Sequence, residues 1–147
     1  MGLSIMKKPF IYAISGYKNS GKTTTITRLI PLLVKKGFRV AVIKHDGHDF
    51  VGDEPGTDSY KHQEAGAYGT AVFSEGHYMV NKRGSSVTER DLIAMFPEAD
   101  IILIEGLKDS IYPKYFCDYP RKVPDDAEVS RLAEEIERLM KDEYDQI

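Results

Sequence analysis

Cysteine, tryptophan and long apolar runs are scarce in this chain of 147 residues. Cys117 is the only cysteine, and tryptophan is absent. A single cysteine excludes an internal disulfide and a metal site built from several cysteines, and it fits a reducing compartment. No apolar run reaches the length of a transmembrane helix, and the N-terminus is too weakly apolar for a signal peptide. The sequence therefore predicts a cytoplasmic protein with no membrane attachment.

Acidic residues are missing from the first 45 positions, although the whole chain has a formal net charge of −3. Nine of the 20 basic residues fall in this segment, so the remainder holds 11 basic and all 23 acidic residues. A basic segment attracts polyphosphate ligands. A stripe of interleaved basic and aromatic side chains, typical of nucleic-acid-binding proteins, is absent. We therefore expect no nucleic-acid partner.

Short apolar runs alternate with amphipathic segments along the chain. Residues 10–15, 39–43 and 100–104 are nearly continuous apolar runs, which is typical of strands buried on both faces of a parallel sheet. Residues 70–74 and 78–81 flank a tight turn and predict a β-hairpin. Three further elements are predicted: a short helix over 58–65, a helix with acids in its first turn over 88–96, and an irregular edge strand within 111–119.

Two longer helices complete the pattern. The first follows the strand at 10–15 and ends before Gly37. Pro31 lies inside it, and its missing N–H is expected to bend or locally break the helix. The second is an amphipathic C-terminal helix over 125–147. Residues 1–8 are predicted to be a disordered N-terminus.

The segment between the first strand and the first helix reads GYKNSGKTT. Its spacing of glycine, four residues, glycine, lysine and threonine matches the phosphate-binding P-loop, and it has the strand and helix that this pattern requires. The glycines let backbone N–H groups converge on phosphate oxygens, and the helix N-terminus adds its positive end. Lys22 can neutralise phosphate charge, and Thr23 can ligate Mg²⁺. The predicted nucleotide-binding residues here are Gly16, Tyr17, Lys18, Asn19, Ser20, Gly21, Lys22, Thr23 and Thr24.

This loop places the predicted fold in the α/β class, among P-loop NTPases. We expect a mostly parallel sheet flanked by helices, with a β-hairpin excursion. The length predicts one nucleotide-binding domain over residues 1–147.

A P-loop site also needs an acid at the end of a neighbouring strand, where it orients Mg²⁺ or the attacking water. Glu105 ends the most apolar strand and is the leading candidate for this catalytic role beside Lys22. Asp46, just past the strand at 39–43, is the second candidate, because ligands bind at the carboxyl ends of strands in such sheets. The predicted metal ligands are therefore Thr23, Glu105 and Asp46.

The stretch KHDGHD concentrates polar residues after the second strand. His45 and His48 flank Asp46, and Asp49 and Asp53 follow closely. Such a group can bind a transition metal, but polar loops routinely carry the same residues. A role for His45 near the phosphates is the favoured interpretation.

No motif that reads guanine is complete. The Asn-Lys-x-Asp pattern of Ras-like GTPases begins at Asn81 but lacks its aspartate and falls in the predicted hairpin. The residues alone therefore leave GTP and ATP open. An arginine-rich lid is absent, and extra cations for fast hydrolysis are not evident, so we expect weak turnover.

Four sequence blocks follow one another in the order GYKNSGKTT, VIKHDGHDF, DEPGTDSYKHQEAGA and ILIEGLKDS. In this order they resemble the MobB family, the molybdopterin-guanine dinucleotide biosynthesis adapter proteins. The third and fourth blocks are much more specific than the P-loop. Together the blocks span most of residues 11–114.

The resemblance implies a GTP-binding adapter with Mg²⁺ and weak GTPase activity. It also implies a homodimer that works with a MobA-type guanylyltransferase, which attaches GMP to molybdopterin, and it makes molybdopterin a further candidate ligand. Leu107 stands where an aromatic residue is frequent in the family. Matched by position, the resemblance adds these residues to the nucleotide site: Lys44, His45, Asp58, Ser59, Gly106 and Lys108.

Two other functions fit the residues. A small-molecule P-loop kinase would need an acceptor pocket and a base, for which Asp46 is available. It predicts phosphate transfer to an added acceptor. A metallochaperone GTPase would use His45, His48 and nearby acids, and it predicts stoichiometric nickel or zinc binding.

Overall fold

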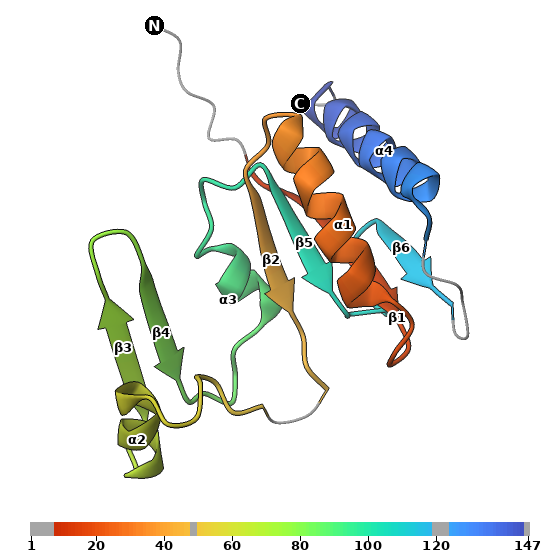
Figure 1. Ribbon diagram of the computed structural model, residues 1–147. Coiled ribbons are helices and arrows are strands. Elements are labelled where there is room, and N and C mark those ends of the chain that lie inside the picture. The colour runs from red at the N-terminus through yellow and green to blue at the C-terminus, as the bar shows by residue number, and fades with distance from the viewer. Residues whose placement is uncertain (1–7, 48–49, 119–123, 146–147) are drawn as a thin grey trace, which may run out of the picture. The chain divides into compact units, whose positions relative to one another are not determined.

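The computed structural model describes residues 8–47, 50–118 and 124–145. Backbone contacts group the chain into two compact units. The first unit runs to His45 and resumes at Glu89, and the second unit is Asp46–Thr88. A domain is defined by independent folding, and two groups of backbone contacts do not test that. The single domain over residues 1–147 therefore stays a prediction. Figure 1 shows the elements of both units.

A parallel sheet forms the centre of the first unit. Its strands are β1 (Phe10–Gly16), β2 (Val40–Lys44), β5 (Ile101–Glu105) and β6 (Lys114–Cys117), in the spatial order β2-β5-β1-β6. β5 pairs in parallel with both β1 and β2, so that Glu105 lies in register with Ile14 and with Lys44. β6 is the opposite edge strand and pairs Cys117 with Gly16. The predicted α/β fold with a mostly parallel sheet is confirmed, and the carboxyl ends of β1, β2 and β5 meet at one edge.

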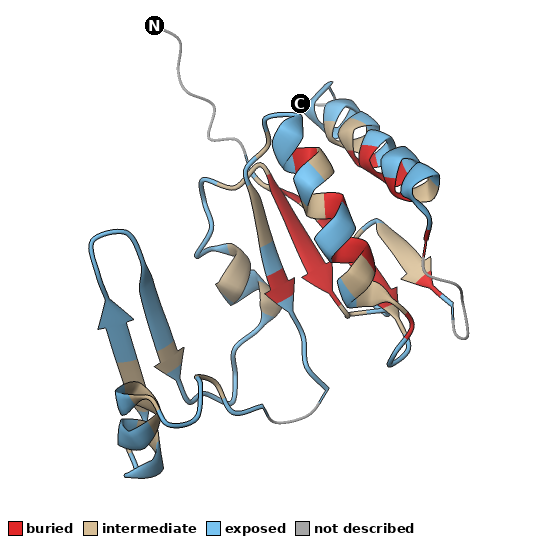
Figure 2. Ribbon diagram, in the orientation of Figure 1, coloured by how far each residue is buried: buried red, intermediate tan, exposed pale blue. Residues whose placement is uncertain are grey.

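One face of the sheet is covered by two helices. α1 (Lys22–Lys35) and α4 (Asp126–Asp145) pack their apolar faces against β1 and β5 in the main core (Figure 2). Leu29 of α1 and Ile136 of α4 are fully buried in this core. α1 runs unbroken through Pro31, so the helix does not break there, and the bend expected at this residue stays a prediction. The packing of this apolar stripe outweighs the loss of one backbone hydrogen bond.

The other face carries a smaller core. Ile102 and Ile104 of β5 are fully buried there, and α3 (Glu89–Ile93) contributes Leu92 and Ile93. The helix is shorter than the predicted 88–96. After the helix, the N–H groups of Met95 and Phe96 bond to carbonyls three residues back, at 3.0 Å each. Pro97 follows directly, and a residue before proline is disfavoured in a helix.

The second unit is a short helix and a hairpin. Its elements are α2 (Asp58–Glu64), β3 (Gly69–Phe73) and β4 (Tyr78–Lys82). Thr57 caps α2 by accepting the Tyr60 N–H, and the hairpin closes where the Ser74 N–H bonds to the His77 carbonyl at 2.8 Å. The predicted hairpin and short helix are confirmed. None of the described residues of this unit is buried, as the pale hairpin in Figure 2 illustrates.

Candidate functional site

The loop between β1 and α1 is shaped by two glycines. Gly16 has φ 150° and Gly21 has φ 93°, both in the region that disfavours residues with a side chain. A Cβ on Gly16 would lie 2.5 Å from the Cys117 carbonyl oxygen, because β6 passes directly beside it. Asn19, between the two glycines, also has a positive φ of 59°. The backbone therefore curls tightly before α1 begins at Lys22.

Side chains of the loop are arranged around this curl. The Lys22 Nζ donates to the carbonyls of Gly16 at 2.9 Å and Tyr17 at 3.3 Å. The Ser20 Oγ is buried and has no hydrogen-bond partner among the described residues. Thr25, fully buried one turn into α1, donates to the Gly21 carbonyl at 2.7 Å and anchors the helix start. The loop thus presents an ammonium and an unpaired hydroxyl beside a helix N-terminus.

Glu105 meets the start of α1. The Thr23 hydroxyl donates to Glu105 Oε1 at 2.6 Å across 82 residues of sequence. Glu105 is 7% exposed, because it ends the central strand β5 between β1 and β2. The structure therefore brings together the two residues of the first unit that the sequence predicted as Mg²⁺ ligands.

The turn after β5 is tied to its neighbours on both sides. The Gly106 N–H donates to the Ile14 carbonyl at 3.0 Å, and the Ser15 hydroxyl donates to the Gly106 carbonyl at 2.7 Å. On the other side, the His45 N–H donates to the Glu105 carbonyl at 3.0 Å. Sequence reasoning missed Ser15, whose hydroxyl is fully buried and whose partner lies 91 residues away.

The lysines of the first unit take different positions. Lys44 ends β2 with an exposed side chain, and Lys18 lies exposed in the loop. The Lys108 Nζ lies 4.8 Å from the centroid of the Tyr17 ring. That ring also meets Phe116 edge-on, with centroids 5.7 Å apart. The sequence did not indicate that Phe116 lies beside the loop, because it is one of several aromatic residues in an irregular stretch.

Three predicted site residues belong to the second unit: Asp46, Asp58 and Ser59. Asp58 opens α2, and the Ser59 hydroxyl donates to the Asp53 carboxylate. This bond, with the Glu54 backbone N–H, holds the pKa of Asp53 below its usual value. Their roles toward a nucleotide stay predictions.

A metal cluster of the metallochaperone type is not found within the described ranges: no group of three histidine, cysteine or acidic side chains is close enough to hold an ion. His48 and Asp49, which that hypothesis uses, lie outside the described residues. None of the described helices is long and apolar enough to cross a bilayer.

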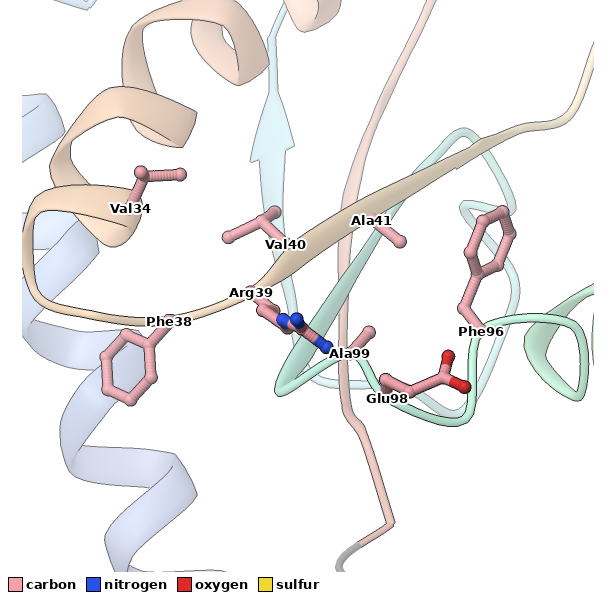
Figure 3. A pocket seen from close by; sticks show the side chains of 8 residues that line it. All are labelled: Val34, Phe38, Arg39, Val40, Ala41, Phe96, Glu98 and Ala99. Atoms are coloured by element: carbon pink, nitrogen blue, oxygen red, sulfur yellow. The ribbon is translucent and has the colours of Figure 1, made fainter. Parts of the chain in front are cut away.

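A separate groove of about 450 Å³ lies near the amino ends of β2 and β5. Figure 3 shows its side chains, which include Phe38, Val40, Phe96 and Ala99. The phosphate-loop residues follow the carboxyl end of β1, so this groove is not part of the candidate site.

A family model decides what this arrangement belongs to. The model described as "Molybdopterin guanine dinucleotide synthesis protein B" matches residues 11–131, which include the loop, Glu105 and the second unit. The chain belongs to the MobB family. Its P-loop, sheet and hairpin are therefore features of a MobB family member.

Two curated relatives agree with this assignment. The molybdopterin-guanine dinucleotide biosynthesis adapter protein of Haemophilus influenzae is 33% identical over 107 residues, which cover 71% of this chain and 60% of that protein. The probable adapter protein of Bacillus subtilis is 37% identical over 114 residues, covering 73% of this chain and 64% of the relative. This MobB family chain thus spans about three fifths of the length of these relatives.

The fold is shared with a solved structure. The crystal structure of a MobB protein homolog from Bacillus stearothermophilus superposes with a TM-score of 0.64 at 22% identity. The match covers 87% of this chain and 98% of that chain. At this identity the likeness supports the fold alone.

Proposed function

We propose that this chain binds GTP with Mg²⁺ at the loop between β1 and α1, hydrolyses GTP weakly, and acts as an adapter in molybdopterin-guanine dinucleotide biosynthesis beside a MobA-type guanylyltransferase. The observation that carries the proposal is the 2.6 Å bond from the Thr23 hydroxyl to Glu105. It joins the two groups that a P-loop site uses at its metal. Membership of the MobB family supports GTP over ATP and supports the adapter role.

The loop fits a polyphosphate. Gly16 has no room for a side chain because β6 and Ser20 lie beside it, so the curl of the loop requires glycine at this position. The Ser20 hydroxyl lacks a partner among the described residues, and a buried hydroxyl gains stability when it is paired. Among the described residues, the Lys22 ammonium donates only to neutral loop carbonyls, which phosphate oxygens would replace as stronger, charged acceptors.

The Thr23–Glu105 pair fits a magnesium ion. A carboxylate that is 7% exposed is costly to keep charged unless a cation or several donors lie near it. The ion would supply positive charge that neutralises the phosphates. Glu105 would hold it directly or through a water, with the Thr23 hydroxyl as a second oxygen ligand.

Calorimetric titration with a non-hydrolysable GTP analogue in Mg²⁺, with the ATP counterpart in parallel, tests the site. Lys22→Ala should bind the GTP analogue about 10- to 100-fold more weakly, because charged hydrogen bonds contribute about 1.5–3 kcal/mol. Lys35→Ala, in the last turn of α1, is the matched control and should bind like the parent. Unchanged binding by Lys22→Ala would overturn the site, and preference for the ATP analogue would favour the kinase hypothesis.

Glu105→Gln separates the metal from the phosphates. This variant should lose most of the gain in affinity that Mg²⁺ gives and should release phosphate from GTP more slowly. Its binding without Mg²⁺ should stay close to that of the parent. An unchanged response to Mg²⁺ would remove Glu105 from the metal site.

We also propose that the chain forms a homodimer, and the hairpin of the second unit supports this. Ala71 and Phe73 of β3 pair with Val80 and Tyr78 of β4, and these four side chains share one face of the hairpin. Phe73 and Tyr78 are 85% and 80% exposed. A two-stranded hairpin is marginally stable alone, so an apolar face of this kind is expected to pack against a second copy.

Sedimentation measurements test the dimer. Phe73→Ser with Val80→Ser should shift the chain toward monomer, while Ile111→Ser, which changes a side chain of the first unit that is 91% exposed, should not. If the hairpin variant stays dimeric, the interface lies elsewhere. A pull-down with a MobA-type guanylyltransferase, with the same variants, would show whether this face or another surface binds that enzyme.

A further inference from the structure

The Lys108 ammonium rests on an aromatic ring of the phosphate loop. Its Nζ lies 4.8 Å from the centroid of Tyr17, within the range of a cation–π interaction. Tyr17 is the second residue of the loop, and its own carbonyl accepts from Lys22 at 3.3 Å. Two ammonium groups from distant parts of the chain therefore contact the same residue, one on its backbone and one on its ring.

The Tyr17 ring also packs against a second aromatic side chain. Phe116 of β6 meets Tyr17 at an interplanar angle of 86°, a T-shaped arrangement that aromatic pairs favour. Phe116 is held in register with Ser15 of β1, directly before the loop. Tyr17 is 54% exposed, so its ring packs against Phe116 at the protein surface and is not part of the core.

The backbone that carries Lys108 is fixed as well. Gly106 and Leu107 both have positive φ values, 114° and 49°, which turn the chain sharply after β5. Beyond the turn, the Lys114 ammonium donates to the Lys108 carbonyl at 2.9 Å and to the Ser110 carbonyl at 2.6 Å. Only the long side chain of Lys108 remains adjustable.

Lys108 forms no ion pair within the part of the chain that the structure describes. Among the residues that the structure describes, no carboxylate oxygen lies within 4 Å of its Nζ. An unneutralised ammonium held next to a phosphate loop raises the local positive potential, which favours a polyanion.

We propose that Tyr17 is a positioning residue that holds Lys108 beside the loop as a second cation, after Lys22, for the phosphate groups. The inference rests on the proposed phosphate site and assigns a specific role to two of its predicted residues. The ring keeps the ammonium close to the loop before the ligand arrives. When the ligand binds, the Lys108 ammonium keeps its contact with the ring and donates to phosphate oxygens, which are strong acceptors.

A double-mutant cycle tests this role, with the GTP analogue and with inorganic tripolyphosphate as separate probes. Lys108→Met and Tyr17→Leu should each weaken binding of both probes, Tyr17→Leu by about threefold, the size of an exposed cation–π contact. Tyr17→Leu should add little when Lys108 is already methionine. Tyr17→Phe keeps the ring and should recover most of the affinity that Tyr17→Leu loses. Raising the salt concentration should weaken the parent more than the Lys108→Met variant.

The controls separate this inference from the proposed function. Lys22→Ala reports on the phosphate site itself, whatever Tyr17 does. If Lys22→Ala loses binding but the effects of Tyr17→Leu and Lys108→Met simply multiply, Tyr17 does not act through Lys108 and the inference is wrong. The same holds if Lys108→Met leaves the salt dependence unchanged. Thermal unfolding of each variant, with Lys35→Met as a control for lost charge, identifies any general loss of structure.

Discussion

The two units of this chain are built on opposite plans. In the first unit, buried strands hold a polar edge in place: β5 is buried along its whole length and delivers Glu105 to Thr23. In the second unit, secondary structure forms without any described residue becoming buried. The first unit therefore contains the packing that its site needs. The second unit exposes apolar side chains, so we expect its stability to depend on apolar contacts with another protein surface.

Truncating one buried and one exposed side chain sharpens this comparison most strongly. Leu103→Ala removes a fully buried side chain from β5 and should lower the free energy of unfolding by about 3 kcal/mol. Val80→Ala removes a side chain that is 63% exposed and should change the stability of the monomer by less than about 0.5 kcal/mol. Denaturant titration at low protein concentration measures both, and similar losses would contradict the comparison.

A pair of glycines gives the next largest difference. Gly16→Ala places a Cβ 2.5 Å from a backbone oxygen at a left-handed φ, so we expect a loss of about 2 kcal/mol and much weaker binding of the GTP analogue. Gly76→Ala, in the hairpin turn, meets no atom within 4 Å and should be neutral or slightly stabilising. Thermal unfolding and calorimetry of the two variants check this. If Gly16→Ala kept the stability and binding of the parent, the backbone of β6 would have to move aside at little cost.

Local sequence patterns predicted most elements of both units but not what joins them. The apolar run of β5 and its terminal Glu105 were readable, because a strand and its end are local features. The neighbour relations were not: β6 lies beside β1, and the Ser15–Gly106 bond spans 91 residues. Parallel strands pair across long separations, and nothing in a short window of sequence specifies the partner. The Tyr17–Lys108 contact was missed for the same reason.

Alkaline pH should act on the first unit. Burial raises the pKa of the Tyr12 phenol well above its usual value, and the charge of Glu135 adds to this. The unfolded chain releases this proton near pH 10. The stabilisation that Tyr12 gives to the free energy of unfolding is therefore fully present below about pH 10. Above about pH 10 it declines by about 1.4 kcal/mol per pH unit until the pKa of the folded state is reached.

Tyr12→Phe tests the source of that decline. The variant keeps the ring and should lose less stability above pH 10 than the parent does. Tyr78→Phe, which removes an exposed hydroxyl of the hairpin, should decline as the parent does. The two curves are measured by denaturant titration across the alkaline range. Identical curves for Tyr12→Phe and the parent would place the alkaline sensitivity elsewhere.

Acid should act on the second unit, with the smallest effect of the series. The Ser59 hydroxyl and the Glu54 N–H hold the pKa of Asp53 below its usual value. The folded carboxylate therefore stays charged to lower pH, and its contribution is lost only as the pH falls through that lowered pKa. Ser59→Ala should move the pKa of Asp53 back up, because it removes the largest cause. NMR titration of the Asp53 side chain measures the midpoint. An unchanged midpoint would mean that the exposed network of the second unit does not persist in solution, which would widen its contrast with the buried strands of the first.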